Sequence, residues 1–160
     1  MKLFSRKYQL KADKDHVIRC FTGLEMVAEA ISNIHRDGRV KSVVKSDGLY
    51  LMTKEPMIKI TQFAVDSKGM YSAQITPISK SLKRFGDVII NYIFTSTRLG
   101  TSVVASLESE KIHNLFWRLF VKFIVLALVL QSRSDENKYI QWIEQMYNTA
   151  LHMKATHTLA

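Results

Sequence analysis

The hydrophobic and polar residues at the start of the chain alternate. Residues 2–10 read KLFSRKYQL, and one face of this stretch carries Phe4, Arg6, Tyr8 and Leu10. A period of two with mostly aromatic and aliphatic side chains on one face predicts a β-strand.

The period then becomes helical. Hydrophobic residues recur every three or four positions between His16 and Ile34, which is typical of an amphipathic helix. Asp13 or Asp15 precedes this segment and can cap its first turn. Gly23 lies in the middle, and glycine costs about 1 kcal/mol in a helix interior. The pattern therefore predicts two short helices with a bend between them.

Residues 39–108 predict a succession of strands joined by hairpins. Asp47-Gly48 separates two β-rich runs, as a tight primed turn requires. Residues 66–69 and Leu99-Gly100 separate two further pairs of strands, and Pro56 begins a strand at an edge, where no ladder donor is lost. Six strands in a meander result, with the N-terminal strand as a seventh.

The chain is helical in pattern from residue 110 onward. One hydrophobic stripe runs through residues 112–130 and a second through residues 139–151. Ser132 or Ser134 between them can cap a new helix, so we expect one kinked helix or two consecutive helices. We expect a single domain over residues 1–154 and a frayed tail over residues 155–160.

Residues 115–131 (LFWRLFVKFIVLALVLQ) form the most hydrophobic run, interrupted by Arg118 and Lys122. Hydropathy alone leaves open whether this run crosses a membrane, lies on one, or is buried, because the two charges offset the apolar gain. An antiparallel meander needs an element to cover its apolar face, which favours a buried core helix over a membrane-surface helix or a span.

The net charge is +9, from 23 Lys and Arg against 14 Asp and Glu. Such a balance favours an anionic partner, whether nucleic acid, anionic lipid or the ribosome, but the charges are scattered, as on a basic solvated surface. The basic loop SKSLKRF (79–85) has too few aromatic residues for a nucleic-acid platform, and we expect no sequence-specific nucleic acid. The single cysteine and the absence of a secretory signal predict a cytoplasmic protein, possibly peripheral to a membrane.

Residues with catalytic or metal-binding potential are dispersed. His152 and His157 are five apart but have no accompanying cysteine pair. Cys20 has no obvious activating base, and no glycine-rich phosphate loop or serine elbow occurs. We therefore expect no catalytic set, no metal site and no cofactor, although a single polar pocket group would leave no spacing signal.

Three segments resemble the START-like, or polyketide cyclase (SRPBCC), superfamily, as does the order of elements. They are residues 8–21 (YQLKADKDHVIRCF), 86–108 (GDVIINYIFTSTRLGTSVVASLE) and 138–150 (KYIQWIEQMYNTA). The resemblance implies an α+β helix-grip fold, in which a seven-stranded curved antiparallel sheet (β-α-α-β6-α) wraps around a long C-terminal helix. The tryptophan that the family often carries after the second short helix is missing from AEAISNI, and residues 111–131 exceed the usual closing helix in length and apolarity. The subfamily is therefore open.

The superfamily's cavity lies between sheet and helix and usually holds a lipid, sterol, quinone or polyketide. The resemblance thus implies a binding or carrier protein for a hydrophobic small molecule. A cyclase- or hydrolase-type enzyme and a basic protein that docks on the ribosome or an anionic membrane are the alternatives. Alternation along the strands and the helical stripes give the pocket candidates, for which a role as ordinary core residues is the alternative. The candidates are Tyr8, Tyr50, Ile58, Ile60, Tyr71, Tyr92, Phe94, Phe116, Leu119, Phe120, Phe123 and Trp142.

Overall fold

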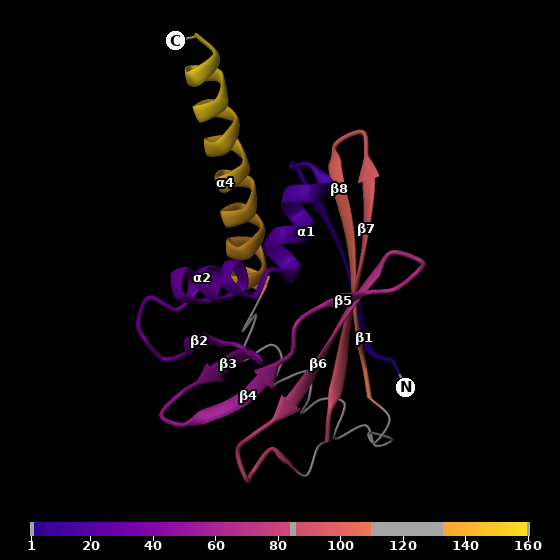
Figure 1. Cartoon of the computed structure of the whole chain (residues 1–160), viewed down its shortest axis with the longest axis vertical. Coiled ribbons are helices and arrows are strands. Elements are labelled where there is room, and N and C mark those ends of the chain that lie inside the picture. The colour runs from indigo at the N-terminus through magenta and orange to yellow at the C-terminus, as the bar shows by residue number, and fades with distance from the viewer. Residues whose placement is uncertain (1, 84–85, 110–132, 160) are drawn as a thin grey trace.

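The computed structural model describes residues 2–83, 86–109 and 133–159 (Figure 1). The expected helix over the first hydrophobic stripe, including residues 115–131, lies outside the described residues. Phe116, Leu119, Phe120 and Phe123 lie outside them as well. None of the helices in the described ranges is long and apolar enough to cross a membrane.

The chain forms an α+β fold with one antiparallel sheet. Its elements are β1 (Lys2–Leu10), α1 (Lys14–Thr22), α2 (Leu24–Ile34), β2 (Lys41–Lys45), β3 (Gly48–Met52), β4 (Pro56–Ile60), β5 (Ala64–Val65), β6 (Met70–Pro77), β7 (Val88–Thr97), β8 (Gly100–Glu108) and α4 (Arg133–Leu159). The strand order is β1-β8-β7-β6-β4-β3-β2, and β5 pairs with β6. The sheet thus has β1 and β2 at its two edges.

The bend between the first two helices is confirmed. The Asp13 carboxylate accepts a hydrogen bond of 2.8 Å from the backbone N–H of His16, which caps α1. Gly23 ends α1 by donating its N–H to the Arg19 carbonyl at 2.8 Å, and α2 begins at the next residue. A Cβ at Gly23 would lie 2.7 Å from that same carbonyl oxygen, so the bend requires glycine for space.

The described part of the sheet has eight strands rather than the seven we expected, because the single strand predicted after Pro56 is divided into β4 and β5. Thr61 marks the break. Its N–H donates to the Gln74 carbonyl at 3.0 Å, and its hydroxyl oxygen accepts from the Gln74 N–H at 2.9 Å. A side chain thus replaces a backbone acceptor in the ladder, and the following residues leave the strand.

Helices α1 and α2 cover one face of the curved sheet (Figure 1). The alternation in β7 is confirmed, since Val88, Tyr92 and Phe94 are buried whereas Ile89 and Ile93 are exposed. The inward side chains form two hydrophobic clusters, one mainly between α2 and strands β3, β4 and β6, and one mainly between helices α1 and α4 and strands β7 and β8. This core occupies the space between helices and sheet in which a ligand would have to lie.

Helix α4 starts beside α1 and α2 and projects past the body of the molecule (Figure 1). Tyr139 and Ile143 are its buried side chains among the described core residues. Residues 148–156 are exposed. The helix continues to Leu159, and no glycine or proline interrupts residues 133–159. The frayed tail over residues 155–160 stays a prediction. The domain boundary near residue 154 stays a prediction.

Candidate functional site

A small enclosed cavity lies between the sheet, the two short helices and the start of α4. Its volume is about 50 Å³. Its lining is hydrophobic apart from two hydroxyl groups and consists of Phe21, Leu24, Val27, Ile60, Phe63, Ile75, Ile90, Tyr92 and Tyr139. Helices α1 and α2 thus contribute three lining residues, whereas α4 contributes one.

Phe21 stands at the centre of the aromatic residues around this cavity. Its ring centroid lies 5.2 Å from that of Tyr92, 5.4 Å from Tyr139 and 5.9 Å from Phe94. Phe63 stacks on Tyr92 from the other side at 5.5 Å. Such tilted and edge contacts are the preferred aromatic arrangements, so the cavity wall is a packed aromatic cluster.

The two cavity hydroxyls differ in their hydrogen bonding. Tyr139 donates to the carbonyl oxygen of Cys20 at 2.6 Å. Tyr92 is 91% buried, and its hydroxyl has no hydrogen-bond partner among the described residues. Burial raises the pKa of Tyr92 and of Tyr139 well above that of a free tyrosine. Both hydroxyls are therefore neutral, and that of Tyr92 is available to a ligand.

The structure brings six of the sequence-derived candidates to the interior. Ile60 and Tyr92 line the cavity. Ile58 and Phe94 are buried in the adjoining core. Tyr8 and Tyr71 are half-buried, with ring centroids 6.4 Å from Phe21 and 5.5 Å from Phe94 respectively.

Two candidates lie elsewhere. Tyr50 is on the outer face of the sheet, because the buried Leu49 and Leu51 on either side take the inner face. Its hydroxyl donates to Asp47 at 2.7 Å, and the ammonium of Lys45 lies 4.7 Å from its ring centroid. Trp142 lines a separate surface groove.

Sequence reasoning omitted all three lining residues that the short helices provide. Phe21, Leu24 and Val27 belong to the helical stripe that predicted these helices, and this stripe was the available signal. The pocket was expected between the sheet and the C-terminal helix alone, so the stripe was interpreted as core. The Asn91 amide is on the opposite side of β7 from Tyr92, and its oxygen accepts a hydrogen bond from the Ser72 hydroxyl at 2.6 Å.

His16 and Cys20 are adjacent but do not form a nucleophile and base. The Nε2 atom of His16 lies 3.5 Å from the Cys20 sulfur and 3.0 Å from the carbonyl oxygen of Ile143. A carbonyl oxygen only accepts hydrogen bonds, so Nε2 carries the proton and cannot remove one from the thiol. Burial also raises the pKa of Cys20 to about 11. We assign the pair a structural role at the contact between α1 and α4.

The described residues also contain no group of three or more His, Cys, Asp or Glu side chains placed to hold a metal ion.

The architecture was compared with known proteins. No protein-family model matches the sequence, and no curated protein matches it. Among solved structures, a protein from Mycobacterium smegmatis superposes with a TM-score of 0.59 at 11% identity, covering 89% of this chain and 88% of that one. Ara h 8.0201 gives 0.56 at 10% identity, covering 88% and 95%. An AHSA1-like protein from Aeromonas hydrophila gives 0.53 at 15% identity, covering 91% and 94%.

These likenesses, with the order of elements, define an α+β protein whose curved antiparallel sheet carries helices on one face around a hydrophobic interior. This architecture is the helix-grip fold that the sequence predicted. The identities are low, so the likeness concerns the fold.

Proposed function

We propose that this protein binds a hydrophobic small molecule in its interior, as a carrier or binding protein. The observation that carries the proposal is the cavity in a helix-grip fold, walled by hydrophobic side chains and bordered by the Tyr92 hydroxyl, which has no hydrogen-bond partner among the described residues. Ligand sites in proteins have this composition, a hydrophobic wall with a few polar groups.

The cavity must enlarge for binding. Its 50 Å³ compares with about 300–1,000 Å³ for sites that enclose drug-sized ligands. Two walls are suited to move. Phe63 is only half-buried and lies in the break between β4 and β5, and Tyr139 belongs to α4, which packs on α1 and α2 over a short contact.

The lining defines the chemistry of the ligand. No charged side chain among the described residues borders the cavity, so a buried charge on the ligand would have no counterion there. The neutral Tyr92 hydroxyl can donate one hydrogen bond. We expect an uncharged hydrophobic ligand with one oxygen acceptor, such as a carbonyl.

The experiment is a titration with the neutral fluorophore N-phenyl-1-naphthylamine, together with native mass spectrometry of the freshly purified protein. We expect saturable binding of one fluorophore per chain. Ile75→Phe fills the cavity and should abolish the signal, whereas Ile89→Phe, the same change on the exposed face of β7, should leave it intact. Equal binding by both variants would contradict an interior site.

A further inference from the structure

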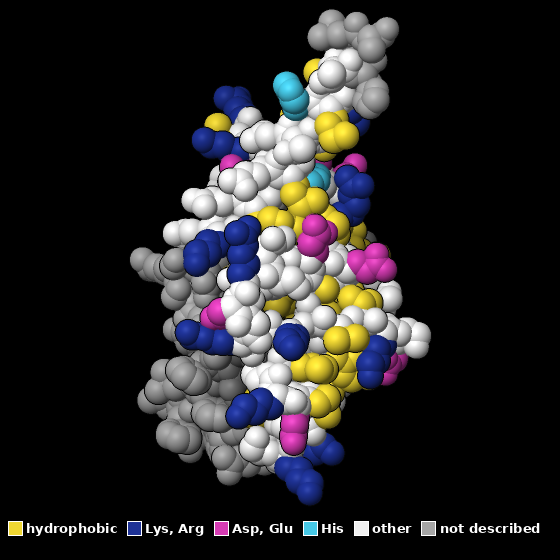
Figure 2. Space-filling model, turned by 90° about the vertical axis from the view of Figure 1, so that its left-hand side faces the viewer, with side chains coloured by type: hydrophobic (Ala, Val, Ile, Leu, Met, Phe, Trp, Pro, Cys, Tyr) yellow, Lys and Arg dark blue, Asp and Glu magenta, His cyan; other side chains and the backbone are white. Residues whose placement is uncertain are grey.

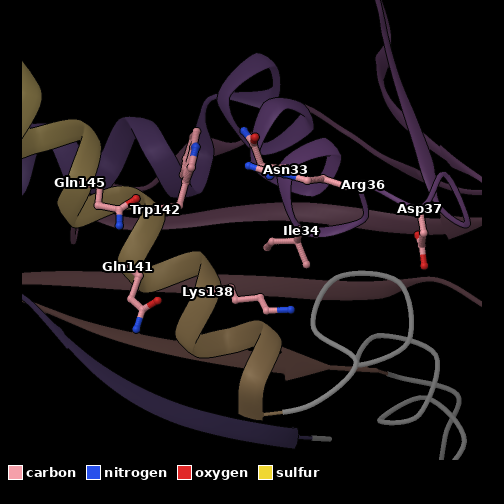
Figure 3. A pocket seen from close by; sticks show the side chains of 8 residues that line it. All are labelled: Asn33, Ile34, Arg36, Asp37, Lys138, Gln141, Trp142 and Gln145. Atoms are coloured by element: carbon pink, nitrogen blue, oxygen red, sulfur yellow. The ribbon is translucent and has the colours of Figure 1, made fainter.

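A second, larger hollow lies at the surface between the end of α2 and the helix α4 (Figure 3). Its volume is about 510 Å³, within the range of small-molecule sites. In Figure 3, residues 33–37 border it from one side and the side chains of α4 from the other. It shares no lining residue with the interior cavity, so it is a separate site.

The charge of this groove favours an anion. Asp37 is the one carboxylate among the described residues that line it, and it is paired with Arg39, whose Nε lies 2.8 Å from Oδ2. Arg36 also borders the groove and has no acidic partner among the described residues. Lys138 is a second bordering cation. Over the face shown in Figure 2, lysine and arginine side chains are distributed widely, so an anion would be attracted from solution and held at the groove by Arg36.

The groove also offers a flat hydrophobic surface. Trp142 is half-buried and packs beside the hydrophobic cluster under α1, with its ring centroid 6.2 Å from that of Tyr139. Its position is therefore fixed by the core, while part of it borders the groove beside Ile34. Tryptophan in this setting stacks on planar ring systems.

Carboxamides complete the lining. Gln141 and Gln145 are four residues apart on α4, so they lie on the same side of the helix. Neither has a hydrogen-bond partner among the described residues. Asn33 uses its amide N–H on the Glu29 carbonyl at 3.1 Å, which leaves its oxygen free to accept. Carboxamides can pair bidentately with the edge of a purine base, since both present a donor beside an acceptor.

From this combination we propose that the groove binds a nucleoside monophosphate. The base stacks on Trp142 and meets the carboxamides of α4, and the phosphate contacts Arg36, where a guanidinium can form paired charge-assisted hydrogen bonds. The site is independent of the hydrophobic interior and gives the protein a second ligand of opposite chemical character.

Isothermal titration calorimetry with AMP, adenosine and ribose 5-phosphate tests the proposal. We expect one saturable site for AMP. Adenosine lacks the phosphate and ribose 5-phosphate lacks the base, so each should bind about tenfold more weakly or worse. The comparison of ribose 5-phosphate with AMP measures stacking without any change to the protein.

Two exposed positions provide matched charge variants. Arg36→Gln should weaken the affinity for AMP about tenfold. Lys68→Gln removes the same charge in the turn between β5 and β6 and should change the affinity for AMP less than about twofold. The cavity variant Ile75→Phe should leave AMP affinity unchanged. Absence of saturable AMP binding, or equal losses in Arg36→Gln and Lys68→Gln, would overturn the proposal.

Discussion

At the scale of single residues, two side chains hold α4 against α1 through reciprocal hydrogen bonds. Tyr139 of α4 donates to the Cys20 carbonyl at 2.6 Å, and His16 of α1 donates to the Ile143 carbonyl at 3.0 Å. Both bonds are buried, where an unmade hydrogen bond is expensive. These residues fix the wall of the cavity that α4 provides.

Tyr139→Phe should lower the free energy of unfolding by about 1 kcal/mol, because it removes one buried hydrogen bond and keeps the ring. Tyr147→Phe is the matched control. Tyr147 also packs on α1, with its ring 5.4 Å from that of His16, but its hydroxyl has no partner among the described residues. Urea denaturation measures the free energy of unfolding of both variants. Equal losses of stability would show that the Tyr139 hydroxyl contributes nothing specific.

Alkaline pH should destabilise the fold. Burial raises the pKa of Cys20 from 9.0 to about 11, so between these values the folded chain keeps a proton that the unfolded chain loses. The stabilisation is complete below the lower value and is lost as pH rises toward the higher one. The raised pKa values of Tyr92 and Tyr139 act in the same direction at higher pH.

Urea denaturation at intervals from about pH 8 to about pH 11 measures how the free energy of unfolding depends on pH. One titrating group can lower it by at most about 1.4 kcal/mol per pH unit. Cys20→Ala should flatten the decline. An identical slope in the variant and the parent protein would rule out the thiol as its source.

The sequence located inward-facing residues better than it located the cavity. Alternation in β7 correctly separated Val88, Tyr92 and Phe94 from Ile89 and Ile93. Alternation does not reveal which inward side chains border empty space, because that depends on how residues distant in sequence fill the interior. Tyr50 illustrates a second limit, since a short run of hydrophobic residues can present either face to the core.

At the scale of elements, close approach of backbones constrains the hairpin β7–β8. Gly100 has a φ of +138°. A Cβ there would collide with the backbone carbonyl of Leu10, at the end of β1. The hairpin turn and the β1 end therefore pack directly on each other.

Gly100→Ala should lower the free energy of unfolding by more than about 2 kcal/mol, because backbone atoms must shift in addition to the strain of positive φ. Gly69→Ala measures the strain of positive φ without a backbone collision. Gly69 has a φ of +81° but no neighbouring atom within 4 Å of the added Cβ, so we expect a loss of about 1–2 kcal/mol. Thermal and chemical denaturation compare the two, and similar losses would argue against the collision.

The boundaries of helices and strands could be predicted where the sequence contains a capping residue or a glycine that ends an element. The Asp13 cap, Gly23 and the glycine turns all carry an explicit local signal. The division of β4 from β5 has none, because Thr61–Phe63 are residues common in strands and the break depends on a hydrogen bond to Gln74, thirteen positions away.

At the scale of the whole molecule, the end of α4 contributes little to the described core. Residues 148–156 are exposed, whereas Tyr139 and Ile143 are buried. A chain ending after Tyr147 should therefore keep the melting temperature of the parent within about 3 °C, which corresponds to less than about 1 kcal/mol for this size. Calorimetry tests this expectation, and a larger loss would show that the projecting turns stabilise the body.

The position of β2 at one edge of the sheet has a consequence for the behaviour of the protein in concentrated solution. Edge strands expose unpaired backbone groups to which another chain can add. In β2, Val43 and Val44 are 39% and 38% exposed and are enclosed between Lys41 and Lys45. These charges oppose strand addition, because two chains paired there would bring their lysines together.

Replacing both lysines by serine should promote aggregation, which light scattering measures, whereas the same change at Lys54 and Lys68 should not. The basic composition thus partly serves to keep the chains apart.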